Sequence, residues 1–126
     1  MIMEEQTQKV YSDSEIDDYI ETVKNIVVGY YKKDKTVYNI KRGNGLAVRI
    51  KHTTIYCIDC GMKLKRTVLA GKFNLKHSNI SITLKRVKQL MEFDKNYRNE
   101  ISEILALIKA FHNGKTDILH EERFVN

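Results

Sequence analysis

The spacing of apolar residues along the chain predicts helices over most of its length. Between residues 14 and 31, apolar side chains recur every three or four positions, as on one face of an amphipathic helix. Ser14 is suited to cap this helix, with Asp17 as its partner in a capping box. The same spacing predicts further helices over 46–60, 65–72, 78–91 and 94–111, and one or two helical turns over 36–40.

Glycine and asparagine residues mark the expected helix ends. Gly61 is suited to end the helix before it in a left-handed conformation. Asn113 and Gly114 are suited to end the last helix. The segment KRGNG, residues 41–45, predicts a loop because its two glycines flank an asparagine.

Together these elements predict one all-α domain, since 126 residues is an ordinary size for a single domain. The short helix, tight turn and longer helix within residues 65–91 match the helix-turn-helix pattern. We therefore expect a small helical bundle of about five to six helices. The expected organisation is a flexible N-terminus (1–13), the helical domain (14–111) and a C-terminal tail (112–126).

Positive charge is concentrated in the middle of the chain, although the formal net charge is only +6. Residues 31–88 hold fifteen lysines and arginines against two carboxylates. Residues 1–30 and 89–126 each hold more carboxylates than basic side chains. A basic middle between acidic ends indicates a surface for a polyanion, and a solvated lysine-rich surface is the alternative.

The start of the chain, MIMEEQTQ, lacks the long apolar stretch of a secretory signal. No apolar run approaches the roughly 18–20 residues of a membrane span. We expect a cytoplasmic protein whose two cysteines are reduced.

Cys57 and Cys60 form a C-x-x-C motif, which can be half of a zinc site or a redox pair. A structural zinc site needs four ligands, and no second pair follows. Cysteines at this spacing on a helix are typical of two small core residues. The sequence also lacks a phosphate loop, a G-x-S-x-G elbow and paired histidines, so it predicts neither an enzyme nor a cofactor.

The segment KHSN, residues 76–79, stands where the second helix of the helix-turn-helix begins. The start of such a helix can enter the major groove of DNA, where its side chains meet base edges. His77, Ser78 and Asn79 can all hydrogen-bond to bases, and asparagine pairs bidentately with adenine. This segment therefore predicts base contacts, with phosphate contacts from the basic residues around it.

Residues 26–111, about two-thirds of the chain, resemble the C-terminal duplex-binding domain of the bacterial replication initiator DnaA. The segment IVVGYYKKD is similar to the V-x-x-Y-Y segment of that family, and KRGNGLAVRIKH to K-R-R-x-x-x-(I/V)-x-x-x-R-(Q/H). KFNLKHSNISITLKRVKQL resembles x-F-G-G-R-D-H-(S/T)-T-V-x-x-A-x-x-K-I, with one residue missing in the turn. The resemblance implies a Trp-repressor-like helix-turn-helix that binds double-stranded DNA.

Carried over position by position, the resemblance implies three kinds of DNA contact. A basic loop would reach into the minor groove, and the helix that follows it would contact the major groove or the DNA backbone. Residues near the first helix of the motif would contact phosphates. Together with the residues around KHSN, the candidate DNA-binding residues are Lys41, Arg42, Lys51, His52, Arg66, Thr67, Lys76, His77, Ser78, Asn79, Lys85 and Arg86.

The chain departs from the family pattern at four places. Gly43 stands where the family has its groove-reading arginine, and Lys76 where it has an aspartate. Asn74 alone replaces the paired glycines of the turn, and Arg66 with Thr67 replaces an apolar residue and a proline. Lys76 adds positive charge where the family has a hydrogen-bond acceptor, so we expect phosphate affinity with a different preferred DNA sequence.

The leading hypothesis is a sequence-specific duplex-DNA-binding protein that acts in replication or transcription control. The ATPase domain of the initiator is not part of this sequence, which suggests a stand-alone relative from a phage or mobile element. The alternative is a protein-interaction module on the same scaffold, which binds a host replication or defence protein through the acidic helix 14–31 or the tail. A zinc or redox protein is the third hypothesis.

Overall fold

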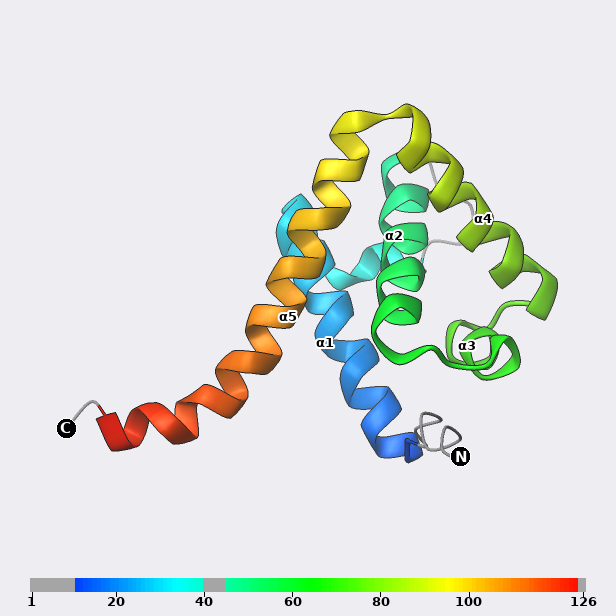
Figure 1. Ribbon diagram of the computed structural model, residues 1–126. Helices are drawn as coiled ribbons and strands as arrows, with labels where there is room; N and C mark the ends of the chain where they lie inside the picture. The colour runs from blue at the N-terminus through cyan, green and yellow to red at the C-terminus, as the bar shows by residue number, and fades with distance from the viewer. Residues whose placement is uncertain (1–10, 40–44, 125–126) are drawn as a thin grey trace, which may run out of the picture.

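The structure is a computed structural model that describes residues 11–39 and 45–124, with side chains through Asn113. All regular structure in this part of the chain is helical, which confirms the predicted all-α fold (Figure 1). The elements are α1 (Asp13–Tyr31), the 3₁₀ helix η2 (Lys35–Asn39), α2 (Gly45–Met62), α3 (Arg66–Phe73), α4 (His77–Phe93) and α5 (Lys95–Phe124).

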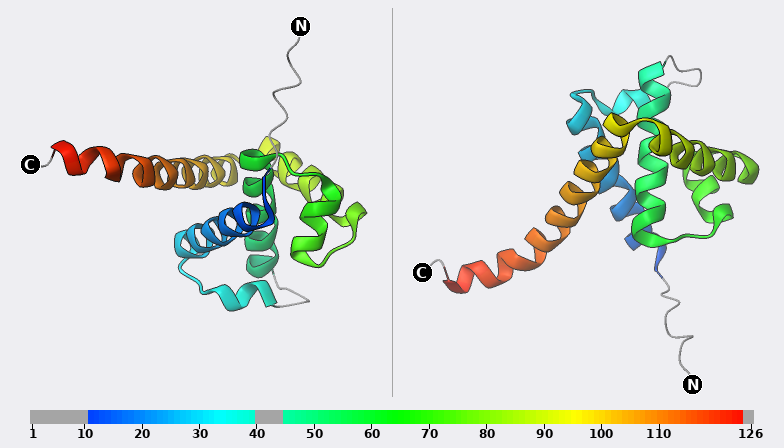
Figure 2. Two further views of the ribbon diagram at one scale, coloured as in Figure 1. Left: turned by 90° about the horizontal axis from the view of Figure 1, so that it is seen from below. Right: turned by 45° about the horizontal axis from the view of Figure 1, so that its top comes forward.

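Helix α2 lies at the centre of the bundle and packs against α1, α4, α5 and η2. It is therefore buried on more than one side, and even Thr53 and Thr54 are fully enclosed. The main core joins apolar side chains of all five α-helices, and a smaller cluster joins Val87, Tyr97 and Ile101 between α4 and α5. Helices α3 and α4 lie on one side of α2, and α1 and α5 lie on the other (Figure 2).

The first helix begins at a different cap from the predicted one. Ser12, not Ser14, is the N-cap, and its side chain accepts a hydrogen bond from the Glu15 backbone nitrogen at 3.1 Å. The Glu15 carboxylate accepts one from the Ser12 backbone nitrogen at 2.9 Å, which completes the capping box. Asp17 instead forms an ion pair with Lys72 of α3 at 2.9 Å. The prediction was wrong because two serines compete here and Ser12 has a full-length glutamate at the right spacing.

The end of α2 also differs from the prediction. Gly61 lies inside the helix, and Lys63 has the left-handed conformation, with φ of 54°. Gly61 has another role, because an added Cβ would lie 1.8 Å from the Tyr19 hydroxyl oxygen. The close approach of α1, rather than a helix cap, explains a glycine at this position.

Helix α5 continues through Asn113 and Gly114 to Phe124, so the predicted stop at these residues is wrong. Glycine lowers helix propensity by only about 1 kcal/mol, which does not force a helix to end. The last turns of α5 extend away from the other helices (Figures 1 and 2). The predicted tail is therefore helical backbone over most of its length.

The predicted helix-turn-helix is present as α3, residues 74–76 and α4. Asn74 ends α3 in the left-handed conformation, with φ of 56°. The Leu75 backbone nitrogen donates to the Ala70 carbonyl at 2.9 Å, and that of Asn74 donates to Gly71 at 3.3 Å, which is a Schellman motif. Asparagine tolerates this backbone region better than most residues, so Asn74 alone supports the tight turn.

Candidate nucleic-acid interface

The first turn of α4 exposes the residues that were predicted to contact bases. Lys76 is the N-cap, and it, His77, Ser78 and Asn79 are all exposed. The N-cap Lys76 makes no side-chain hydrogen bond to the first amide groups of α4, which lie at the positive end of the helix dipole. Phosphate oxygens are suitable acceptors for such groups.

A groove of about 290 Å³ lies between α2 and α4 and brings together residues from both helices. Lys51 and His52 come from α2, and Asn79 and Arg86 come from α4. These four were predicted from separate parts of the sequence, and the fold places them around one groove. None of the remaining lining residues was predicted to bind DNA. They are Tyr38, Val48, Ile55, Phe73, Leu75, Ile82 and Thr83.

Tyr38 of η2 lies along the groove and is held in place by the core. Its hydroxyl lies 2.7 Å from the Thr54 hydroxyl and donates to the Lys24 carbonyl at 3.3 Å. Burial raises the pKa of Tyr38 to about 12, so the phenol stays neutral. An aromatic residue three positions before the predicted loop is a weak sequence signal, because only the fold turns η2 back onto α2.

A second hollow of about 380 Å³ continues the groove along α2. It shares Val48, His52 and Arg86 with the first and reaches Gly45, the first residue of α2. Lys41 and Arg42, predicted for the minor groove of DNA, lie outside the described residues.

His52 is half-buried between the two hollows. Burial lowers its pKa below the usual 6.5, and the nearby charges of Arg86 and Lys51 lower the pKa further. His52 is therefore neutral at neutral pH and offers one donor and one acceptor nitrogen. A phosphate placed between these two cations would reverse this effect, because a nearby anion favours the protonated imidazole.

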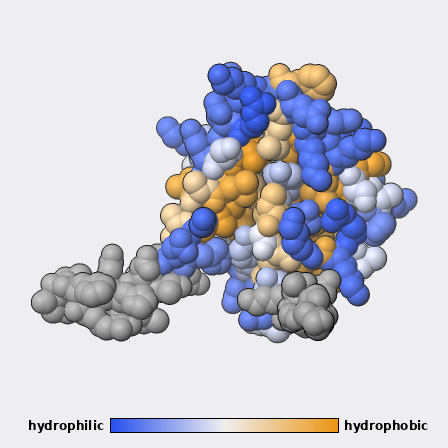
Figure 3. All heavy atoms as spheres, viewed as in Figure 1, coloured by the Kyte–Doolittle hydropathy of each residue, from blue (hydrophilic) through white to orange (hydrophobic). Residues whose placement is uncertain are grey.

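Several basic residues of the middle segment are engaged inside the protein instead. Arg66 donates to the Asp59 carboxylate at 3.1 Å, and Lys72 forms an ion pair with Asp17. Arg49 donates to Glu100 at 3.0 Å. Of the other predicted residues, Thr67, Lys85 and Arg86 are exposed, and Arg66 is only partly so. On the face seen in Figure 3, hydrophilic side chains dominate over α3 and α4, with smaller hydrophobic areas between them.

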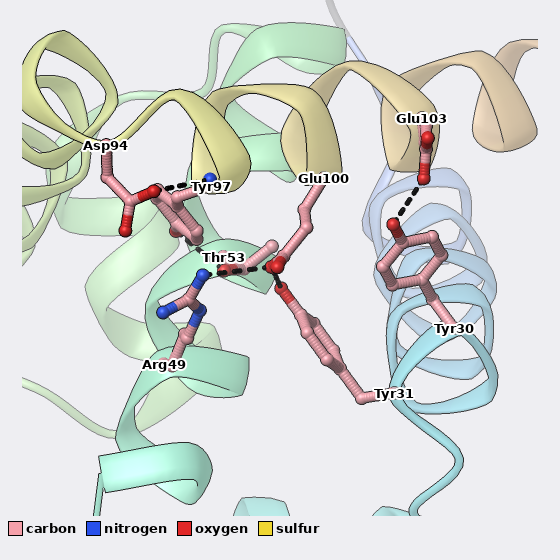
Figure 4. Close-up of polar contacts among 8 residues, drawn as sticks. All are labelled: Tyr30, Tyr31, Arg49, Thr53, Asp94, Tyr97, Glu100 and Glu103. Atoms are coloured by element: carbon pink, nitrogen blue, oxygen red, sulfur yellow. Dashed lines mark hydrogen bonds and ion pairs between the residues drawn. The ribbon is translucent and has the colours of Figure 1, made fainter.

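A polar network holds α2 in its place behind the groove (Figure 4). The Glu100 carboxylate accepts hydrogen bonds from Arg49 at 3.0 Å and from the Tyr31 hydroxyl at 2.8 Å. The Thr53 and Tyr97 hydroxyls lie 2.7 Å apart, and the Arg49 guanidinium lies 4.4 Å from the centre of the Tyr97 ring. These contacts join the end of α1, the first half of α2 and the start of α5.

The two cysteines differ in how deeply they are buried. Cys57 is fully buried, and burial next to Cys60 raises its pKa to about 12. Both cysteines are free thiols, and Cys60 is half-buried. Within the described residues, no group of three or more histidine, cysteine, aspartate or glutamate side chains is arranged to hold a metal ion. In the same part of the chain, no helix combines the length and apolar character needed to cross a membrane.

Searches with protein-family models, of curated proteins and of solved structures each found no match to this chain. The resemblance to the DnaA domain stays a prediction. The function therefore has to be argued from the groove and the helix around it.

Proposed function

We propose that this protein binds double-stranded DNA with sequence preference, through the first half of α4 and the groove between α4 and α2. Its role would be in replication or transcription control, as the DnaA resemblance suggests. The observation that carries the proposal is the convergence of Lys51, His52, Asn79 and Arg86 on one groove beside the exposed start of α4.

The charges of this surface favour a polyanion. Lys51, Arg86, Lys76 and Lys85 lie on or beside the groove, and no acidic residue lines it. Elsewhere in the described bundle, Arg49, Arg66 and Lys72 form ion pairs with carboxylates. A basic groove whose lining includes no carboxylate is suited to phosphate groups, which supply most of the affinity of DNA-binding proteins.

The shape of α4 favours duplex DNA among polyanions. A helix whose first turn is exposed and polar fits the major groove, where the bases present distinct patterns of donors and acceptors. His77, Ser78 and Asn79 occupy that first turn. Their side chains provide the donors and acceptors that base recognition needs.

The test is fluorescence anisotropy on random duplexes and on duplexes selected from a random pool, across a salt series. Binding should weaken steeply with salt, because each phosphate contact releases counterions. Lys51→Ala should weaken binding to all sequences and lower the salt slope by about 1, whereas Asn79→Ala should reduce discrimination by about 1–3 kcal/mol. Lys109→Ala on α5 is the charge-matched control. Salt-insensitive or absent binding would reject the proposal.

A second candidate function, a protein-interaction module, is favoured by a different surface. A hollow of about 550 Å³ lies between α1 and α5, lined by Asn25, Ile26, Gly29, Tyr30, Leu107, Ala110 and Phe111. Leu107 and Phe111 are 48% and 43% exposed, which is costly for large apolar side chains in water. Capture of one partner protein that Phe111→Ala abolishes, together with no selectivity for DNA, would support this function over the first.

A further inference from the structure

Four residues of the groove form a single stripe along α4. Leu75, Asn79, Ile82 and Arg86 follow one another at intervals of four, three and four residues, which places Asn79, Ile82 and Arg86 on one face of the helix. Leu75 comes just before α4, in the turn that follows α3. The stripe therefore alternates aliphatic, amide, aliphatic and guanidinium groups.

The two aliphatic members of the stripe are unusually accessible. Leu75 is 40% exposed and Ile82 is 47% exposed. The buried face of α4 consists of Ile80, Thr83, Leu84 and Val87, so Ile82 is not required to complete the core. A single exposed aliphatic residue needs no explanation, but here two of them flank the one amide side chain of the stripe.

We infer that Leu75 and Ile82 contact the C5-methyl groups of thymines beside the base pair that Asn79 reads, so that the protein prefers A·T pairs at these positions. The inference rests on the proposed function. Methyl groups of thymine are the apolar feature of the major groove, and they are bound by apolar side chains. Asparagine pairs with adenine, whose partner base carries such a methyl group.

The spacing along the helix agrees with this assignment. A rise of about 1.5 Å per residue separates Asn79 from Ile82 by about 4.5 Å along the helix axis. Successive base pairs lie about 3.4 Å apart on each strand. Asn79 and Ile82 can therefore meet neighbouring base pairs. Arg86 lies about 6 Å further along α4 and beside Lys51 and His52, where the phosphate backbone would pass.

The experiment removes methyl groups from the DNA instead of the protein. A duplex is selected from a random pool, and each of its thymines is replaced in turn by uracil, which lacks only the C5 methyl. At one or two neighbouring positions the replacement should weaken binding about four-fold, the effect of exposing one buried methyl group. Replacements elsewhere in the duplex should have no effect.

The protein variants connect each methyl group to a side chain. Ile82→Ala should bind the thymine and uracil forms equally at one of the sensitive positions, and Leu75→Ala should do so at another. Leu107→Ala removes an equally exposed aliphatic side chain on α5 and should keep the full sensitivity. Thermal melting of each variant checks that the fold is intact.

The outcomes separate this inference from the proposed function. Selective, salt-dependent duplex binding with no sensitivity to uracil at any position would overturn the inference and leave the proposed function standing. If binding by both Ile82→Ala and Leu75→Ala stays fully sensitive to the replacement of thymine by uracil, the assignment of the methyl contacts to these residues would be overturned. Absence of salt-dependent duplex binding would defeat the proposed function, and the inference with it.

Discussion

The hydroxyl of Tyr19 lies where a side chain on Gly61 would have to be, with only 1.8 Å between its oxygen and an added Cβ. Gly61→Ala should therefore destabilise the protein by about 1–2 kcal/mol, because the Tyr19 ring must move and this overpacking exceeds the helix propensity that alanine gains. Chemical denaturation measures the change.

Gly29→Ala is the matched control, since Gly29 is also helical and nothing lies within 4 Å of its added Cβ. This variant should be more stable than the wild type by about 0.5–1 kcal/mol. Equal changes of the unfolding free energy in both variants would mean that Tyr19 does not constrain position 61.

The Glu100 network makes a second prediction. Glu100→Ala leaves both Arg49 and the Tyr31 hydroxyl without their carboxylate acceptor in a partly buried site, and should cost about 1–3 kcal/mol of unfolding free energy. Glu103→Ala, one helical turn further along α5, removes a hydrogen bond from Tyr30 at an exposed position and should cost less than about 1 kcal/mol. Denaturant titrations of the two variants compare them directly, and equal losses would contradict a structural role for Glu100.

The half-buried His52 predicts a loss of stability in acid. Its pKa in the folded protein is lowered by burial, Arg86 and Lys51, so the unfolded chain binds a proton more readily than the folded one. The contribution of neutral His52 is present above pH 6.5 and is lost as the pH falls below this value. Melting temperatures from pH 7.5 to 5.5 should fall more for the wild type than for His52→Gln. If the melting temperatures of the two proteins fall in parallel with pH, His52 does not contribute to the loss of stability in acid.

DNA binding should depend on pH in the opposite direction. If a phosphate lies between Lys51 and Arg86, it raises the pKa of His52, so that the complex takes up a proton. Affinity for a selected duplex should therefore rise as the pH falls from 7.5 to 6, and His52→Gln should remove most of this rise. Anisotropy at fixed salt measures it, and a pH-independent affinity of the wild type would place the phosphate elsewhere.

The two cysteines should differ in reactivity. Cys57 is fully buried and its pKa is raised to about 12, whereas Cys60 is only partly buried. A thiol reagent should modify one cysteine in the folded protein and two in denaturant, and Cys60→Ser should abolish the native reaction. Rapid modification of both cysteines under native conditions would contradict this burial.

The helices could be predicted because their signals are local. The recurrence of apolar residues within α1 or α4 reflects a single face of one helix, and each predicted start lies within one residue of the observed one. The tight turn between α3 and α4 was also predictable, although the left-handed conformation at Asn74 came only from the structure. The caps were less predictable, because neighbouring residues such as Ser12 and Ser14 compete on small energy differences.

The sequence by itself determined an all-α chain with a helix-turn-helix and a basic middle, since composition and helical periodicity require no knowledge of distant contacts. Only the tertiary structure decided which basic residues pair with carboxylates and which gather around the groove. It commits Arg49 to Glu100 and Arg66 to Asp59, and it leaves Lys51 and Arg86 around the groove. The reason is physical: charge pairing and groove formation depend on which helices pack together, and residues such as Arg49 and Glu100 are neighbours only in the folded chain.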